Sequence, residues 1–241
     1  MTAPLDVLAV MAHPDDAEIF CGGALIKSAD NGERTGVLDL TAGEAASRGT
    51  VESRAREAEA AAAALGLAER RCAGLNDADL VNSRESRGVV AGIVRALRPR
   101  VIVTHWTRGR HPDHRAAAAL ARDAAFLAGL RNFPAEGRRH RPEKVVYAMA
   151  FSEEAVKPTF GVDISAQMDR KIAALEAYGT QFLGRSGIGE VFPGGDRPVL
   201  DQIRSAHAAW GSLIRRAYAE PYWTEETAMV ETLGGLTVAT F

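Results

Sequence analysis

The strongest constraint on the fold is a repeated alternation of short apolar runs with longer, Ala-rich stretches. The short apolar runs expected to be strands are Val7–Met11, Gly36–Thr41, Arg71–Ala73, Val101–Thr104 and Val145–Met149. The stretches between them that are expected to be helices are Asp16–Asn31, Glu52–Leu65, Ser83–Leu97 and Pro112–Ala128. Strands that alternate with helices of this length form βαβ units, which build a parallel sheet covered on both faces. The sequence therefore predicts an α/β, Rossmann-like three-layer sandwich with a mostly parallel sheet.

The last third of the chain is less regular. We expect helices over Asp163–Tyr178 and Pro198–Tyr218, and a strand over Ala228–Val230. The Gly-rich segment Gly184–Arg197 is expected to be a loop, either a mobile one near the functional site or a plain surface connection. Because no repeat or low-complexity linker interrupts the 241 residues, we expect one domain over residues 1–241.

Composition excludes several classes of protein. The chain has 29 Lys and Arg against 31 Asp and Glu, so it lacks the basic excess of a general nucleic-acid binder. The two cysteines, Cys21 and Cys72, cannot form a disulfide framework, which favours a reducing compartment. Residues 1–12 lack the layout of a signal peptide, and no apolar run is long enough for a membrane span. We therefore expect a cytoplasmic protein without a membrane or nucleic-acid partner.

Two polar motifs follow predicted strands directly. AHPDDAE occupies residues 12–18 after the first strand, and RHPDH occupies residues 110–114 after VIVT. Since the carboxyl ends of parallel strands share one edge of the sheet, we expect the two motifs to meet there. The simpler alternative is helix capping by the aspartates, with histidines on the surface. Three of the six histidines lie in these two motifs. The capping alternative therefore requires that both strand ends carry histidine and aspartate by coincidence.

Two imidazoles and one carboxylate are a ligand set for hydrolytic zinc, which keeps a coordination position open for water. His13, Asp16 and His114 supply such a set, which leaves Asp15 free to act as a general base. The residues alone do not decide which of the two adjacent aspartates binds metal. His111 is then available to stabilise an oxyanion or protonate a leaving amine, and Asp113 to orient it.

These motifs resemble those of the PIG-L/LmbE superfamily of zinc-dependent N-acetylglucosamine deacetylases, and the resemblance runs through nearly the whole chain. The segments RPEKVVYAMAF, KPTFGVDIS and KIAALEAYGTQF resemble the branch that acts in bacillithiol biosynthesis. That branch removes acetate from N-acetylglucosaminyl malate. The resemblance thus implies a metal-dependent N-deacetylase that acts on a small glycoconjugate.

The resemblance also implies roles for individual residues. The metal ligands would be His13, Asp16 and His114, the base Asp15, and the electrophilic histidine His111 with Asp113 as its partner. Arg54 and Asp77 match substrate-contacting positions. The implied cofactor is Zn²⁺, with Fe²⁺ or another divalent ion as alternatives, because affinity order and supply both matter. A homo-oligomer, hexamer or trimer, is implied as well.

Arginines near the same sheet edge favour an anionic substrate. Arg48 and Arg110 fall in segments expected there, and guanidinium groups bind carboxylates such as those of malate in a bidentate manner. The alternative is that they are solvated surface residues. Tyr178 and Gln181 follow a predicted helix and are interpreted as packing residues unless they lie near the site, and the tryptophans as core or interface residues.

Other functions remain open at this point. A different glycoconjugate, such as the mycothiol precursor or a chitin-type disaccharide, is the main alternative substrate. A non-catalytic sugar-binding protein on the same fold would be expected to have lost ligands, yet all six motif residues are present. A dinucleotide-binding oxidoreductase is disfavoured, because it needs a Gly-rich turn after the first strand.

Overall fold

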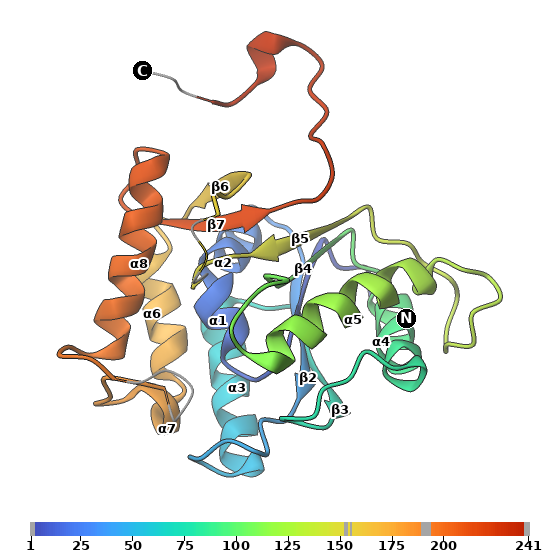
Figure 1. The fold of residues 1–241 in the computed structure, drawn as a ribbon, viewed down its shortest axis with the longest axis horizontal. Coiled ribbons are helices and arrows are strands. Elements are labelled where there is room, and N and C mark those ends of the chain that lie inside the picture. The colour runs from blue at the N-terminus through green and yellow to red at the C-terminus, as the bar shows by residue number, and fades with distance from the viewer. Residues whose placement is uncertain (1–2, 152–153, 155, 189–193, 239–241) are drawn as a thin grey trace.

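Seven strands and eight α-helices make up the regular structure in the part of the chain that the structure describes (Figure 1). This structure is a computed structural model, and it describes residues 3–151, 154, 156–188 and 194–238. In chain order the elements are β1 (Val7–Met11), α1 (Asp16–Phe20), α2 (Gly22–Asp30), β2 (Thr35–Thr41), α3 (Val51–Leu65), β3 (Glu69–Leu75), α4 (Arg84–Leu97), β4 (Val101–His105), α5 (Pro112–Ala128), β5 (Lys144–Ala148), β6 (Phe160–Asp163), α6 (Met168–Glu176), α7 (Gly179–Phe182), α8 (Val199–Leu213), β7 (Ala219–Trp223) and the 3₁₀ turn η1 (Leu233–Gly235).

The strands form one sheet in the order β3-β2-β1-β4-β5-β7-β6. The first five are parallel, and β7 pairs antiparallel with both β5 and β6. The chain builds the sheet outward from β1 through β2 to β3, and then returns to place β4 on the other side of β1. Ligands of open α/β sheets bind beyond the strand ends at such a reversal. The loops after β1 and β4 therefore share the position where a site is expected.

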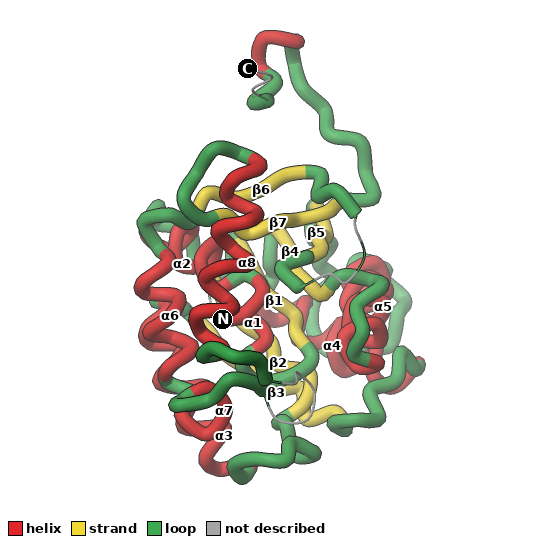
Figure 2. The backbone as a smooth tube through the Cα atoms, turned by 60° about the vertical axis from the view of Figure 1, so that its left-hand side comes forward, coloured by secondary structure: helices red, strands yellow, loops and turns green. Residues whose placement is uncertain are grey.

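Helices cover both faces of the sheet, which confirms the predicted three-layer α/β architecture (Figure 2). The alternation of side chains along β1 separates the two cores, because successive residues of a strand point to opposite faces. Leu8 and Val10 pack in the cluster that includes residues of α4 and α5. Ala9 and Met11 pack in the cluster that includes residues of α1, α2 and α6.

The predicted helix over Asp16–Asn31 is two helices, with a break at Cys21. Cys21 has φ −143° and ψ 11°, which are not helical values. The first amides of α2 find their acceptor in another part of the chain, because Gly23 N and Ala24 N donate to the Glu220 carboxylate at 2.7 and 2.8 Å. A carboxylate at a helix N-terminus satisfies free N–H groups and interacts favourably with the helix dipole. The Glu220 carboxylate thus caps α2 from a distant part of the chain, and these hydrogen bonds compensate for those that the break removes.

Predictions for the last third were wrong in part. The segment Asp163–Tyr178 starts at the end of β6, and its helix α6 begins only at Met168. The helix predicted over Pro198–Tyr218 ends at Leu213. The final strand is β7, Ala219–Trp223, and Ala228–Val230 has no regular structure. Glu220 and Pro221 interrupt the apolar pattern of β7, which explains why the sequence does not indicate this strand.

Of the predicted loop Gly184–Arg197, residues 189–193 lie outside the described residues. Ile188, on its described part, contributes to the wall of the cavity discussed below. None of the described helices combines the length and apolar character that a membrane crossing needs.

Candidate metal centre and substrate cavity

The turn after β1 brings His13, Asp15 and Asp16 to the carboxyl edge of the sheet. Asp15 has φ 106°, a positive value that is uncommon for residues other than glycine. Strained backbone of this kind persists where the surroundings hold it, and it is concentrated at functional sites. Asp16 begins α1, and its Oδ2 accepts a hydrogen bond from the His13 backbone N–H at 2.9 Å. The turn therefore holds the His13 ring and the Asp16 carboxylate close together.

The second motif starts α5. His111 is the N-cap, and its Nδ1 accepts a hydrogen bond from the backbone N–H of Asp113 at 3.2 Å. Pro112 occupies the first turn, where its missing N–H costs nothing. His114 lies in this turn as well, and its Nε2 is 3.2 Å from Oδ1 of Asp16. The two predicted motifs thus meet, although they are about 100 residues apart in sequence.

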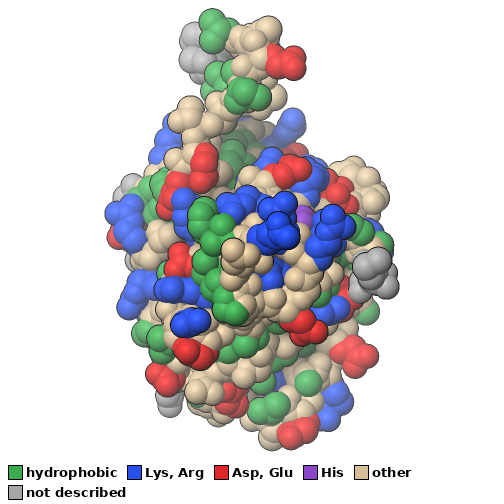
Figure 3. Space-filling view, turned by 90° about the vertical axis from the view of Figure 1, so that its right-hand side faces the viewer, with side chains coloured by type: hydrophobic (Ala, Val, Ile, Leu, Met, Phe, Trp, Pro, Cys, Tyr) green, Lys and Arg blue, Asp and Glu red, His purple; other side chains and the backbone are tan. Residues whose placement is uncertain are grey.

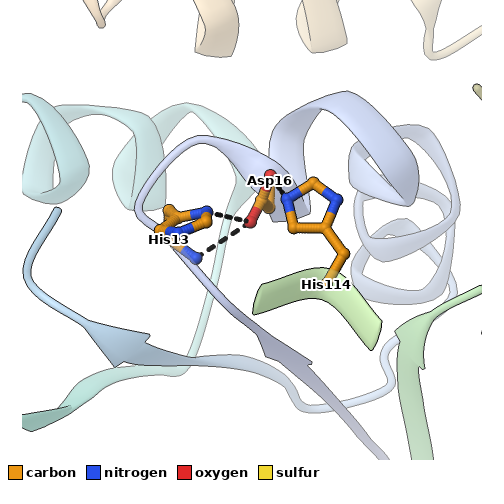
Figure 4. A group of neighbouring side chains, drawn as sticks. All are labelled: His13, Asp16 and His114. Carbon is orange, nitrogen blue, oxygen red and sulfur yellow. Dashed lines mark hydrogen bonds and ion pairs between the residues drawn. The ribbon is translucent and has the colours of Figure 1, made fainter. Parts of the chain in front are cut away.

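The carboxylate of Asp16 lies between two imidazole rings (Figure 4). Its Oδ2 is 3.2 Å from His13 Nδ1, on the side opposite His114. One ligand atom from each of His13, Asp16 and His114 lies within 4.8 Å of the others. Two imidazole nitrogens and one carboxylate oxygen match the donor set of catalytic zinc, and also that of non-haem iron(II). The arrangement therefore fits a divalent cation.

A second group with the same spacing shares His13. It consists of His13, His111 and Asp113. The Asp113 carboxylate was expected to orient His111, but its Oδ2 lies 3.3 Å from His13 Nε2 and accepts from the Ala78 amide at 2.8 Å. The contact of Asp113 with His111 is made by its backbone N–H instead. Asp77 also reaches His13, with Oδ1 3.1 Å from Nε2. Asp113 and Asp77 thus contact Nε2 of His13, whereas Asp16 lies at its Nδ1.

His105, the last residue of β4, belongs to the site and was not predicted. Its Nε2 lies 3.2 Å from Asp16 Oδ2, and its ring stacks on that of His114 with 3.9 Å between centroids. The signal was available, since a histidine ends the apolar run VIVT directly at the strand's carboxyl end. His105 is buried, and its Nε2 also accepts from the backbone N–H of Ala12 at 3.0 Å. The His105 ring therefore lies against both the Asp16 carboxylate and the His114 ring.

The pKa values in the cluster show how its charges are balanced. Burial lowers the pKa of His114 to about 4, so its imidazole is neutral and can act as a ligand. Burial alone would raise the pKa of Asp16, but His114 and His105 hold it well below its usual value. For His13, burial is outweighed by Asp113, Asp16 and Asp77, which keep the pKa well above 6.5. Because three carboxylates converge on the His13 ring, this ring holds a proton when no cation is bound. A cation that binds to the ring would displace that proton.

Asp15 lies beside His13 and Asp16, but its carboxylate pairs with an arginine. The Arg54 guanidinium lies 3.3 Å from Asp15 Oδ2 and also donates to the carbonyl of Pro14. Burial raises the pKa of Asp15 to about 7, although the charge of Arg54 opposes the shift. Arg54 itself is buried, and its guanidinium lies 5.8 Å from the ring centroid of Tyr178. Arg54 therefore holds the Asp15 carboxylate and the turn that carries it.

These residues open into a cavity of about 560 Å³, a size typical of small-molecule sites. Most predicted site residues line it, namely His13, Asp15, Asp16, Arg54, Asp77, Arg110, His111 and His114. The wall also includes Gln181, which was interpreted as a packing residue, and Trp106. Arg48 is the exception among the predicted substrate residues, because it does not line the cavity. Its backbone carbonyl accepts a hydrogen bond from Gln181 Nε2 at 3.1 Å.

Removing one ligand tests which of the two groups binds metal. We expect His114→Ala to weaken divalent metal binding by more than about 100-fold, because changes beyond the direct ligands already cost about 10–100-fold. Metal content after dialysis, measured by plasma mass spectrometry, checks this result. His140→Ala is the matched control, since His140 contacts the carbonyl of Pro99 and lies outside the cluster. If His111→Ala empties the site while His114→Ala leaves it full, the metal is held by the second group.

Known proteins are similar to this chain in both sequence and fold. The family model PIG-L, GlcNAc-PI de-N-acetylase, matches residues 8–125. A diacetylchitobiose deacetylase from Thermococcus kodakarensis is 30% identical over 192 residues, which cover 73% of this chain and 70% of that protein. A 1D-myo-inositol 2-acetamido-2-deoxy-alpha-D-glucopyranoside deacetylase from Actinosynnema mirum is 27% identical, with 75% of this chain and 82% of that protein covered.

A solved structure agrees with these matches. The conserved protein TT1542 from Thermus thermophilus superposes with a TM-score of 0.83 and 37% identity, covering 95% of this chain and 98% of that one. The matched residues 8–125 contain both motifs of the candidate metal centre. Together, the sequence matches and the shared architecture show that this chain belongs to the PIG-L family of N-deacetylases, which are amide hydrolases.

Proposed function

We propose that this chain hydrolyses the N-acetyl group of an N-acetylglucosaminyl conjugate, giving acetate and a free amine. The observation that carries the proposal is the convergence of His13, Asp16 and His114 on the wall of a cavity that also holds Asp15 and His111. When bound to these three residues, a divalent cation supplies Lewis-acid chemistry, which polarises a carbonyl and lowers the pKa of water to about 7.

The remaining residues have distinct tasks in this reaction. Asp15 takes the proton from the attacking water, and Arg54 keeps its carboxylate in place. As water adds, a C–O bond forms to the acetyl carbon, and the C–N bond then breaks. The Asp113 N–H donates to His111 Nδ1, so the neutral ring carries its proton on Nε2. That N–H can donate a hydrogen bond to the oxyanion of the tetrahedral intermediate. Asp15 returns its proton to the leaving amine.

Within this class we propose N-acetylglucosaminyl malate as the substrate. Support comes from the three segments that resemble the bacillithiol branch and from Arg110, which lies on the cavity wall and could pair with a malate carboxylate. Two other conjugates are supported by the relatives. These are the inositol glycoside named for the Actinosynnema mirum protein and the disaccharide named for the Thermococcus kodakarensis protein.

A substrate panel tests the proposal. The protein, freed of metal and reloaded with Zn²⁺ or Fe²⁺, is incubated with the malate conjugate, the inositol conjugate and N,N′-diacetylchitobiose. Released acetate and free amine are then measured. We expect equal amounts of both products, highest for the malate conjugate and abolished by a chelator. A preference for another conjugate would overturn the malate assignment alone. Binding of all three without turnover in either metal form would contradict catalysis and favour a sugar-binding protein.

A further inference from the structure

One end of the cavity is lined by apolar side chains that the proposed deacetylation does not use. We define the apolar end as Ile19, Phe20, Phe151, Ile188, Val199 and Ile203. All six belong to one hydrophobic cluster, in which Phe20, Phe151 and Ile188 are only partly buried. An acetyl group brings a single methyl group to such a wall. The apolar end is therefore larger than the acetyl group requires.

Apolar side chains also occur on the outer surface, where Figure 3 shows them among Lys, Arg, Asp and Glu. Mixed surfaces of this kind are ordinary, because polar atoms cannot cover a whole protein. An apolar wall inside a cavity is different, because ligand pockets combine such walls with a few polar groups that orient the ligand. The apolar end therefore indicates a part of the substrate that is itself apolar.

The apolar end begins at the candidate metal centre. The Phe20 ring stands edge-on to the His114 ring, with 5.6 Å between centroids, and its centroid is 6.1 Å from that of Phe151. Figure 4 shows His13 across from His114. The neighbour of His13 is polar, because Asp77 Oδ1 lies 3.1 Å from its Nε2. The candidate metal centre thus has an aromatic neighbour at His114 and a carboxylate at His13.

A sugar ring fits the polar part of the wall better than the apolar end. Asp77, Arg110 and His111 line the cavity and offer hydrogen-bonding groups. The hydroxyls of a glucosamine unit need such partners, because a hydroxyl that loses water without a replacement costs free energy. The aliphatic and aromatic side chains of the apolar end supply none. The sugar is therefore placed beside Asp77, Arg110 and His111.

The geometry of the amide then directs the acyl group. A secondary amide is planar and strongly prefers the trans form, so the sugar and the acyl chain lie on opposite sides of the C–N bond. With the carbonyl at the candidate metal centre and the sugar at the polar residues, the acyl chain extends toward Phe20 and Phe151. We propose that the apolar end binds this chain, and that the protein hydrolyses unbranched N-acyl groups longer than acetyl, such as hexanoyl.

This inference rests on the proposed function, because the same residues carry out the hydrolysis. Water adds to the acyl carbon, where a C–O bond forms, and the C–N bond breaks. The products are a fatty acid carboxylate and the free amine of the sugar. A longer chain changes only what is bound beyond the carbonyl carbon, so no additional reactant is needed.

A series of acyl chain lengths tests the proposal by binding and by turnover. The ligands are methyl glycosides of N-acetyl-, N-butanoyl- and N-hexanoylglucosamine, and the hexyl glycoside of N-acetylglucosamine carries the same chain on the other side of the sugar. NMR titration of the metal-free protein should give a dissociation constant that falls about fourfold for each added methylene of the acyl chain. With divalent metal bound, KM for acid release should fall likewise and kcat should change little, since the chain is held equally in the ground and transition states.

Two variants locate the effect at the apolar end. Phe151→Asn and Ile188→Asn each place a polar amide on a partly exposed part of the wall, where it loses hydrogen bonds to water when a chain covers it. Each should remove most of the gain in affinity from acetyl to hexanoyl. Leu213→Asn is the matched control, because Leu213 is 60% exposed on α8 and does not line the cavity, and it should keep the full gain.

Several results would overturn the proposal. A dissociation constant that does not fall from acetyl to hexanoyl would show that the apolar end does not take the acyl chain. A gain for the hexyl glycoside alone would assign the apolar end to the group on the anomeric carbon. Release of acetate without release of hexanoate would exclude the longer substrates. Failure to release any acid, acetate included, would contradict the proposed function as well, and the binding series would still show whether the apolar end takes the acyl chain.

Discussion

Replacing Asp15 with asparagine is expected to lower kcat by about 10²–10⁴-fold, the usual contribution of a general base. The amide has nearly the same shape but cannot take a proton from water. Asparagine also tolerates positive φ better than most residues, so the turn at φ 106° should be retained. Steady-state acetate release gives kcat, and metal content and thermal unfolding should match the wild type. The effect would thus be confined to proton transfer.

Asp79→Asn is the matched control for this experiment. Asp79 is exposed on the loop after β3 and does not line the cavity, so the same chemical change there should leave kcat unchanged. Near-wild-type turnover of Asp15→Asn would remove Asp15 from the mechanism. A loss of bound metal in this variant would instead make Asp15, and not Asp16, the carboxylate ligand.

A second large effect, on folding stability, is expected from the fully buried ion pair of Glu220 and Lys171, whose charged atoms are 2.6 Å apart. Lys171 also donates to the carbonyl of Ile19 and to His207, whose pKa burial holds well below its usual value. Glu220→Leu should lower the free energy of unfolding by about 3–5 kcal/mol, because it leaves a buried ammonium without its counter-charge. It also removes the cap of α2. Urea unfolding followed by circular dichroism measures the change.

Lys171→Met gives a second, more specific test, because it should lower the free energy of unfolding by less than Glu220→Leu does. Without Lys171, the carboxylate of Glu220 still accepts from Gly23, Ala24 and Tyr222. Arg204→Met, which breaks an exposed pair with Asp169, is the control and should have a much smaller effect. If Lys171→Met proved the more destabilising change, the cap of α2 would not be the main role of Glu220.

The local sequence pattern is sufficient to predict the bounds of elements that have a clear periodicity and residues that mark their ends. The strands from Val7 to Met11 and from Val101 onward were predicted to within one residue. The helix α5 was predicted with its observed bounds, because Pro112 and the Ala-rich run mark it in sequence. In contrast, the break at Cys21 depends on Glu220, which is 197 residues from Gly23. No local signal can report an acceptor that arrives from so far along the chain.

The candidate site likewise contains residues that the sequence predicts and contacts that it does not. His13, Asp16 and His114 could be named from two motifs, because the carboxyl ends of parallel strands must share an edge. The contacts of Asp113 and Arg48 were not predictable, since they depend on how the loops after β2 and β3 pack around those motifs. His105 was overlooked because it ends an apolar run that has the pattern of a buried strand.

The order of residues alone determined the α/β class and the two motifs that meet at its edge, because side-chain periodicity and strand direction are local properties. Tertiary structure decided which nitrogen faces which carboxylate, which helix is broken, and which apolar residues after β7 are left in water. These outcomes depend on the distances between groups far apart in the chain. Only the packed sheet and its helices fix those distances.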